Sequence, residues 1–317
     1  MISRGRVIAF GDVNVDLVVD LPGNLDVDHP EAALFSGGTV GNTAAGMARL
    51  GMDVSFLGKV GDDGYGRFIR DEFKKEGVDT GWLLVDKDDF TLMVIAFIDQ
   101  KGEKHNITWP PEGTAQFKLD ESDFPEGVWD NVSWFHTSGI ILGESPSQQT
   151  TLKMMQKARQ KGIPVSFDLN LRLEYFGWRK GVRDAVLKAI ALSDYIFASL
   201  DEELAPLTGE TDHRKIISAL MHPGLTIIAR QGKEDSLVFI TNDSFNVPTI
   251  NVEVVDTLGA GDAFNSGFIL GKIEGKSLLE SIEIAHCCAG FNLTRKGARG
   301  LPDRIELNAL LKEYYKR

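Results

Sequence analysis

The sequence predicts an α/β protein in which helices cover both faces of a mainly parallel sheet, with a smaller β-sheet beside it as a lid. Short apolar runs rich in β-forming residues alternate with helical patterns through most of the 317 residues, and this alternation is typical of parallel sheets. Two segments instead alternate apolar and polar positions between turn residues, which is the pattern of hairpins. No linker or internal repeat divides the chain, so we expect one domain over residues 1–317.

Six short runs are the predicted strands of the main sheet, because each is apolar and is followed by turn residues or a helical pattern. Ser145-Pro146 would cap a helix that continues to Arg159, with Gly162 as its stop. A further amphipathic pattern over residues 304–317 predicts a terminal helix. The strand runs are Val7–Phe10, Val54–Leu57, Val132–His136, Val165–Asp168, Tyr195–Ala198 and Leu225–Ala229.

The lid is expected from two segments, at about residues 13–36 and 90–112. Val13–Phe35 alternates apolar and polar positions. Thr91–Ile98 is followed by the polar turn residues 99–102, which predicts an antiparallel hairpin. A small separate sheet of this kind would be placed to cover a binding site.

Charge and cysteine content narrow the classes of partner. The formal net charge is −12, which argues against duplex nucleic acid or an anionic membrane surface as a partner. No apolar run approaches the roughly 20 residues needed to cross a bilayer, and no signal-peptide core follows Met1. Cys287 and Cys288 are adjacent and are not expected to bridge, which fits a reducing compartment. We therefore expect a cytoplasmic protein.

The segment with the strongest chemical signal is Asp256–Phe264. It follows a strand-like run, Val252–Val255, and the small residues Gly259, Ala260 and Gly261 open a helix. Small residues let main-chain N–H groups approach an anion closely, and the helix dipole favours negative charge there. Asp262 would lie in the first turn, where a carboxylate can accept a hydroxyl proton during phosphoryl transfer. The alternative is a glycine-rich turn in which the aspartate only stabilises the helix N-terminus.

Two further segments point to one family. Gly37–Ala44 continues into Ala48-Arg49-Leu50-Gly51, and Gly58–Gly66 follows. Together with the segment at Asp262, these resemble the two signatures of the ribokinase-like (PfkB) carbohydrate kinases, in the family's order. The resemblance covers nearly the whole chain and implies a three-layer α/β/α sandwich with a small β-sheet lid. The chain has no Gly-x-x-x-x-Gly-Lys-Ser/Thr motif, so a P-loop kinase is not expected.

The resemblance implies an ATP-dependent transfer of phosphate to a primary hydroxyl of a small sugar such as ribose. Asp262 would be the base, and the amides of Gly259, Ala260 and Gly261 would bind the transferring phosphoryl group. Magnesium and potassium are the implied ions. The implied sugar contacts are Asn14, Asp16, Gly37, Gly38, Asn42, Glu144 and Arg172, the nucleotide contacts Arg230, Gly232 and His286, and the metal-site residues Glu203, Asp256, Leu258, Leu293 and Ala298.

Three positions depart from the family pattern. Leu200 stands where the Asn of the Asn-x-x-Glu motif is expected, Arg230 replaces a nucleotide-binding Thr, and Thr39 replaces a sugar-contacting Lys of ribokinase. Fructokinase, ketodeoxygluconate kinase and nucleoside kinase therefore stay open as alternatives. So does a non-catalytic sugar or nucleotide sensor. By resemblance, the lid strands would also form a homodimer.

Overall fold

The central layer is a mainly parallel sheet, nine-stranded within the residues that the structure describes. The computed structural model describes residues 5–21, 29–99, 104–173, 177–178 and 181–315. The strand order is β13-β12-β11-β10-β9-β8-β1-β4-β5. Two neighbouring pairs in this sheet are antiparallel, β11 with β12 and β12 with β13. The strands are β1 (Arg6–Phe10), β4 (Val54–Gly61), β5 (Leu83–Asp86), β8 (Val132–Ser138), β9 (Val165–Asp168), β10 (Tyr195–Ser199), β11 (Thr226–Arg230), β12 (Ser236–Ile240) and β13 (Asp243–Val247).

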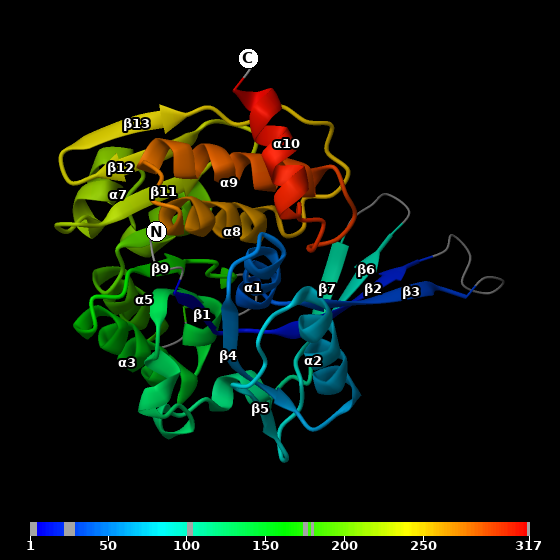
Figure 1. Ribbon diagram of the computed structural model, residues 1–317. Coiled ribbons are helices and arrows are strands. Elements are labelled where there is room, and N and C mark those ends of the chain that lie inside the picture. Colours follow the sequence, from blue (N-terminus) through cyan, green and yellow to red (C-terminus); the bar gives the residue numbers. More distant parts are fainter. Residues whose placement is uncertain (1–4, 22–28, 100–103, 174–176, 179–180, 316–317) are drawn as a thin grey trace.

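Helices cover both faces of this sheet (Figure 1). Each of the six predicted runs contributes to a strand, and the helix predicted at the C-terminal end is α10. The three-layer α/β fold is therefore confirmed. The helices are α1 (Thr39–Arg49), α2 (Gly64–Glu76), α3 (Ser147–Gln160), α5 (Val182–Ala191), α6 (Ala205–Thr208), α7 (His213–Leu220), α8 (Ala260–Ile273), α9 (Leu278–Leu293) and α10 (Arg304–Tyr314).

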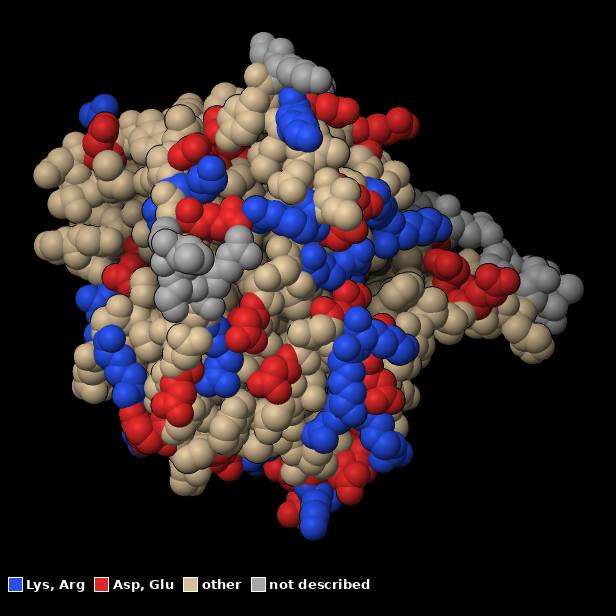
Figure 2. Space-filling model, in the orientation of Figure 1, with Lys and Arg blue, Asp and Glu red and all other residues tan. Residues whose placement is uncertain are grey.

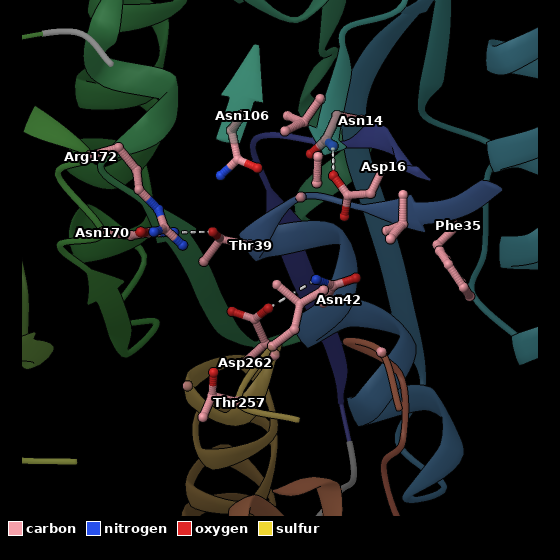
Figure 3. Close-up of a pocket in the computed structure, with 18 of the residues that line it drawn as sticks. Asn14, Asp16, Phe35, Thr39, Asn42, Asn106, Asn170, Arg172, Thr257 and Asp262 are labelled. Atoms are coloured by element: carbon pink, nitrogen blue, oxygen red, sulfur yellow. Dashed lines mark hydrogen bonds between the residues drawn. The ribbon is translucent and has the colours of Figure 1, made fainter. Parts of the chain in front are cut away.

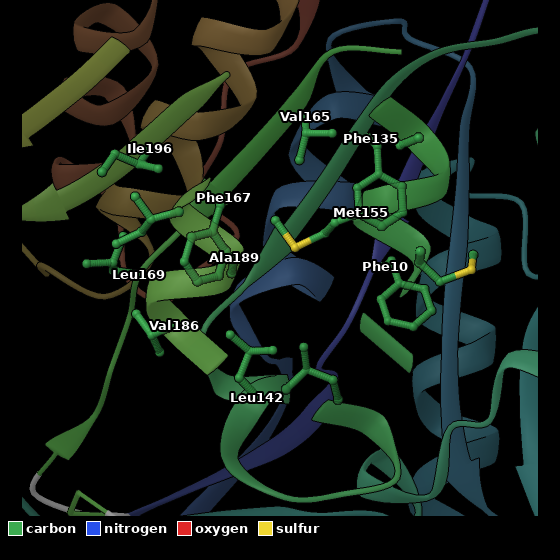
Figure 4. Close-up of a cluster of buried hydrophobic side chains, with 14 of the residues drawn as sticks. Phe10, Phe135, Leu142, Met155, Val165, Phe167, Leu169, Val186, Ala189 and Ile196 are labelled. Atoms are coloured by element: carbon green, nitrogen blue, oxygen red, sulfur yellow. The ribbon is translucent and has the colours of Figure 1, made fainter. Parts of the chain in front are cut away.

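The first strand shows why two helical layers are needed. Side chains alternate between the faces of a strand, and all four residues from Val7 to Phe10 are fully buried. Ile8 and Phe10 pack in the cluster under α3 and α5, which Figure 4 shows in part. Val7 and Ala9 pack in the second cluster with residues of α1 and α8. A strand that is apolar at every position requires cover on both faces.

The predicted lid is a separate four-stranded sheet in the described part of the chain, with strand order β3-β2-β6-β7. It extends from the side of the main sheet (Figure 1). β2 pairs antiparallel with β3 and parallel with β6, and β6 forms the predicted hairpin with β7. The strands are β2 (Asn14–Asp20), β3 (Glu31–Gly37), β6 (Met93–Ile98) and β7 (Lys104–Trp109).

Two local predictions were wrong. Val252–Val255 forms no strand; the Val255 N–H instead donates to the Leu293 carbonyl at 2.7 Å. This stretch leaves the antiparallel edge of the sheet and runs to the end of α9, so it has no neighbouring strand. The helix after Ser145 begins at Ser147, and its N-cap, Pro146, makes no side-chain hydrogen bond.

The surface carries both signs of charge. Figure 2 shows acidic and basic side chains interspersed over the face in view. Within the described residues, each helix is too short or too polar to cross a membrane. Cys287 and Cys288 are buried and form no disulfide within the described residues.

Candidate active site

A cavity of about 1010 Å³ lies between the lid and the carboxyl ends of the main strands. Ligands of open α/β folds bind at this edge of the sheet. The lid contributes polar side chains to one wall, and the starts of α1 and α8 contribute the opposite wall (Figure 3). The cavity therefore joins the predicted lid to the predicted phosphoryl site.

Asp262 lies in the first turn of α8 and lines this cavity. Gly259 precedes the helix in the left-handed conformation, with φ of 76°. A Cβ atom on Gly259 would overlap the Ala298 main chain, so only glycine fits this turn. The loop thus turns sharply into the helix and places Asp262 at its positive end.

The charge state of Asp262 is set by its surroundings. Burial raises the pKa of this carboxyl to about 8, and the nearby Asp168 and Asp12 add to the rise. A hydrogen bond from Asn42 Nδ2, at 2.9 Å from Asp262 Oδ2, and the charge of Arg230 act in the opposite direction. A carboxylate with a pKa near the working pH is a suitable general base.

The lid end of the cavity holds an aspartate and two asparagines. Asn14 Nδ2 donates to Asp16 Oδ1 at 2.6 Å, and burial raises the pKa of Asp16. Gly37 pairs with Asn14 on the neighbouring strand, and any Cβ on it would overlap the Asp16 carboxylate. Asn106 reaches the same space from β7 (Figure 3). A carboxylate beside amides can bind several hydroxyl groups at once.

The loop after β9 closes another side of the cavity. Asn170 and Arg172 both have positive φ, of 30° and 44°, a conformation that is strained for these residues and common at functional sites. The Asn170 amide donates to the Thr39 hydroxyl at the start of α1. Arg172 lines the cavity, and its charge favours the ionised form of Asp16.

Arg230 supplies a fixed positive charge at the end of β11. Its Nη2 and Nη1 donate to Asp168 at 3.0 and 3.2 Å, a two-point geometry that suits arginine. Asn265 donates to the same carboxylate at 2.6 Å. A Cβ on Gly261 would lie 2.7 Å from Arg230 Nη1, so the guanidinium rests against the first turn of α8 and lines the cavity.

The comparison with protein families decides the class. The profile described as pfkB family carbohydrate kinase matches residues 4–304. The chain belongs to the PfkB family. It is a carbohydrate kinase with a ribokinase-like fold, as the two signatures predicted.

Relatives of this PfkB kinase are similar over their full length. A fructokinase of Klebsiella pneumoniae is 33% identical over 97% of this chain and 100% of its own. An aminoimidazole riboside kinase of Salmonella typhimurium is 31% identical over 99% of this chain and 97% of its own. The chain covers both relatives almost completely, so their substrates are the natural candidates to test.

Solved structures agree on the fold. A fructokinase of Xylella fastidiosa with bound ATP has a TM-score of 0.87 at 23% identity, and 99% of each chain is covered. A double-mutant fructokinase of Vibrio cholerae O395, solved with fructose, ADP and potassium ion, has a TM-score of 0.85 at 28% identity. That similarity covers 98% of this chain and 99% of the other.

The residues predicted for a monovalent cation come together in the PfkB kinase. Asp256 accepts N–H groups from Leu258 and Gly297, both at 3.0 Å. The Leu293 carbonyl accepts from Val255 in the same region, and Ala298 packs against Gly259. One carboxylate among main-chain carbonyls is a donor set that fits a hard cation bound through oxygen.

Glu203 has a structural environment that the sequence did not reveal. One of its oxygens accepts the Leu171 N–H at 2.9 Å and the other accepts the Ser199 N–H at 2.6 Å. Burial raises the pKa of Glu203, with a further rise from Asp168. Glu203 therefore ties the loop that carries Arg172 to the end of β10, and it also lines the cavity.

Four predicted contacts lie outside the described lining of the cavity, namely Gly37, Glu144, Gly232 and His286. Glu144 is exposed before α3, Gly232 lies in an open turn, and His286 is buried in α9. The His286 ring packs edge-on against the Phe264 ring, with the ring centroids 5.3 Å apart. Burial lowers the pKa of His286 to about 4. The expectation that these residues contact sugar or nucleotide gains no support from this geometry.

Other residues were missed from the sequence. Asp12 is buried, accepts the N–H of Thr39 at 2.6 Å and the hydroxyl of Ser138 at 2.6 Å, and so anchors the start of α1. Its position directly after the central strand β1 was the available signal. Asn106 and Arg299 had no such signal, because neither belongs to a recognisable motif.

Proposed function

We propose that this PfkB kinase transfers the γ-phosphate of ATP to a primary hydroxyl of a small sugar, and that fructose is the first substrate to test. The observation that carries the proposal is Asp262 at the positive end of α8, facing a cavity with hydroxyl-binding groups at its other end. The fructokinase relatives support fructose over ribose. Thr39, in the position of the ribokinase lysine, supports the same choice.

In the proposed reaction, Asp262 accepts the proton of the sugar hydroxyl as its oxygen bonds to the γ-phosphorus. The bond between the γ-phosphorus and the bridging oxygen breaks, and ADP leaves with that oxygen. The amides of Gly259, Ala260 and Gly261 and the dipole of α8 stabilise the charge on the equatorial oxygens. Arg230, fixed against Gly261, adds a positive charge beside them.

The sugar would be held at the lid end. Asp16 and Asn14 accept and donate hydrogen bonds to neighbouring hydroxyls, and Asn42 lies between them and the base (Figure 3). Gly38 has φ of 93°, and its Cβ would lie 2.7 Å from Val13 Cα. It therefore allows the main chain to pass close beneath the sugar. Arg172 is placed to contact the sugar or the phosphate.

The nucleotide would occupy the part of the cavity beyond α8, which Thr257, Lys296 and Gly297 line. Magnesium would accompany the phosphates, near the Glu203 and Asp168 carboxylates that line the cavity. Potassium at Asp256 would stabilise the loop before α8, and the oxygen donors there fit it. The rate of sugar-dependent ADP release should then rise with added potassium at constant ionic strength.

A riboside is the second candidate. The aminoimidazole riboside kinase relative supports it. The cavity face of the lid also supports it, because this face carries the apolar residues Val18, Val94 and Ala96. Phe35 lies on the same face and is 43% exposed. An apolar surface next to the sugar subsite suits a base attached to the sugar.

A coupled ADP-release assay separates these candidates. We expect the highest kcat/KM with fructose, and comparison substrates are ribose, aminoimidazole riboside, ketodeoxygluconate and adenosine. A clear preference for a riboside would replace the first candidate by the second. Sugar binding in calorimetry without turnover of any substrate would instead establish a sensor.

We also propose a homodimer formed through the lid, in a reducing, cytoplasmic setting. Ile107 is 52% exposed and lies on the face of the lid away from the cavity, and Trp109 and Phe90 stack beside it. The buried thiols of Cys287 and Cys288, which form no disulfide in the described part of the chain, suit a reducing compartment. Light scattering of Ile107→Asp beside the parent protein tests the dimer.

A further inference from the structure

Arg299 lies in the loop between α9 and α10, behind the wall of the cavity. Its Nε donates to Asn42 Oδ1 at 3.2 Å, and its Nη2 donates to Ser36 Oγ at 2.8 Å. The guanidinium carbon is 5.3 Å from the centre of the Phe73 ring. Nη1 is buried without a hydrogen-bond partner. The Arg299 guanidinium therefore lies between α1, α2 and β3, and it is hydrogen-bonded to the side chains of Asn42 and Ser36 near the cavity.

The contact with Asn42 determines which way its amide points. Arginine can only donate hydrogen bonds, so the Asn42 oxygen must face Arg299. The Asn42 NH₂ group must then face Asp262, whose Oδ2 it approaches at 2.9 Å. The direction of both hydrogen bonds follows from the chemistry of arginine and does not rest on the assignment of amide atoms. Asp262 Oδ2 must therefore accept the hydrogen bond from the Asn42 NH₂ group.

The contact with Ser36 reaches the base of the lid. Ser36 is buried in β3 and pairs with Val15, the residue between Asn14 and Asp16. Arg299 thus bonds to the lid strand beside the sugar site and to the helix residue that bonds the base. Burial lowers the pKa of Arg299 to about 10, although Glu76, Glu72, Asp16 and Asp262 oppose this. At neutral pH the side chain stays charged.

We propose that Arg299 is a positioning residue for phosphoryl transfer, which acts through Asn42 to hold Asp262 as a hydrogen-bond acceptor and ties that arrangement to the lid strand at Ser36. This inference rests on the proposed role of Asp262. It adds a residue that belongs to neither signature and touches no substrate. The charged groups that face Asp262 are then Asp12, Asp168, Arg230 and Arg299.

The first test is Arg299→Met, with Arg295→Met as the matched control. Arg295 is in the same loop, and its guanidinium interacts with Phe291, Thr294 and Glu306. Arg299→Met should lower kcat by roughly 10- to 100-fold, the range of a lost positioning contact. The acidic limb of its pH profile should move to higher pH, because the ionised form of Asp262 loses support. The control should keep the parent values.

The second test is a double-mutant cycle with Asn42→Ala. If Arg299 acts through Asn42, removing both side chains should lower kcat about as much as Asn42→Ala alone. Additive losses would overturn the proposal, and so would an unchanged kcat and pH profile in Arg299→Met. Arg299→Lys keeps the charge and loses the two-point contact. It should lose at least about fivefold in kcat, and an unchanged kcat in this variant would also overturn the proposal.

A third readout does not need activity. Carboxyl ¹³C NMR of protein labelled in aspartate, with Asp262→Asn to assign the signal, follows the titration of Asp262 directly. The pKa should be higher in Arg299→Met than in the parent and unchanged in Arg295→Met. An equal pKa in all three proteins overturns the proposal, even if no sugar is phosphorylated. Absence of turnover in the parent protein, by contrast, counts against the proposed function alone.

Discussion

Asp262 carries two roles that conflict. As a base, Asp262 must be ionised. Its burial disfavours the charged form and raises its pKa to about 8. The Asn42 amide and Arg230 reduce this cost by interacting with the ionised form. A group of this kind is favourable for catalysis and unfavourable for stability.

The catalytic role predicts the effect of Asp262→Asn on turnover. The amide keeps the size of the side chain but cannot accept the hydroxyl proton, so kcat should fall by about 10³-fold. The affinity for sugar in calorimetry should change by less than about threefold, because the sugar contacts lie at the lid end. A variant that binds no sugar would contradict the assigned role.

The same substitution should stabilise the protein, by an amount that depends on pH. The pKa of about 8 in the folded protein is above the ordinary aspartate pKa of 3.8. The protonated carboxyl therefore supports the folded state below pH 4, and this support is lost as pH rises through 8. Denaturation at pH 5 and pH 8.5 should show a gain for Asp262→Asn that grows with pH, on the order of 1 kcal/mol or more at the higher pH. An equal gain at both values would mean that the carboxyl titrates normally.

At the scale of elements, the turn before α8 fixes the geometry of the phosphoryl site. Gly259 requires positive φ, and its Cα lies against the Ala298 main chain. The same turn is bonded to the end of α9, since Asn292 donates to the Leu258 carbonyl at 2.8 Å. Any side chain at residue 259 must therefore move the helix start.

Gly259→Ala should destabilise the protein by about 1–3 kcal/mol and reduce kcat more than it raises KM for sugar. The reason is that the strained turn shifts the amides and Asp262 but leaves the lid intact. Urea denaturation and steady-state kinetics measure the two effects. Gly177→Ala, at an open position with φ of 56°, is a matched control that should leave kcat unchanged.

The lid is the second element with a defined role. Asp16 lies on its cavity face, and Gly37 on the neighbouring strand leaves the room its carboxylate needs. Asp16→Ala should raise KM for sugar by about 10- to 100-fold, because bonds to hydroxyls are lost. The KM for ATP should stay within about twofold. An unchanged KM for sugar would place the sugar elsewhere.

At the scale of the whole molecule, segments from both ends of the chain meet at one edge of the sheet. The segments that line the cavity at this edge lie at the ends of strands or the starts of helices. They are residues 12–16, 36–42, 168–172, 230 and 256–262. Parallel strands place their carboxyl ends together, which is why a sugar site and a phosphoryl site can share one cavity.

Buried histidines predict how the whole molecule responds to acid. His136 Nδ1 lies 2.9 Å from Ser166 Oγ, and burial lowers the pKa of this histidine from the ordinary value of 6.5 to about 4. This neutral histidine supports the folded state above pH 6.5, and the support is lost as pH falls toward 4. His136→Asn should therefore flatten the fall in unfolding free energy between pH 6.5 and 4.5. The same slope in both proteins would show that other groups control acid unfolding.

Much of this protein was determined by the sequence alone. Burial on both faces made β1 apolar from Val7 to Phe10, and local apolar runs of this kind allowed the sheet to be predicted. Gly259 and Gly37 are required by close contacts with the Ala298 main chain and with the Asp16 carboxylate, and such requirements are visible residue by residue. The lid hairpin followed from alternation and turn residues for the same reason.

Only the tertiary structure decided which distant groups meet. Arg299 bonds to Asn42 and Ser36, more than 250 residues away, and no local pattern predicts such a contact. The exposure of Glu144 and the main-chain role of Glu203 depend likewise on the path of the whole chain. Hydrophobic periodicity is a property of neighbours in sequence, whereas the pKa of Asp262 and the direction of the Asn42 amide arise from charges and donors brought together by folding.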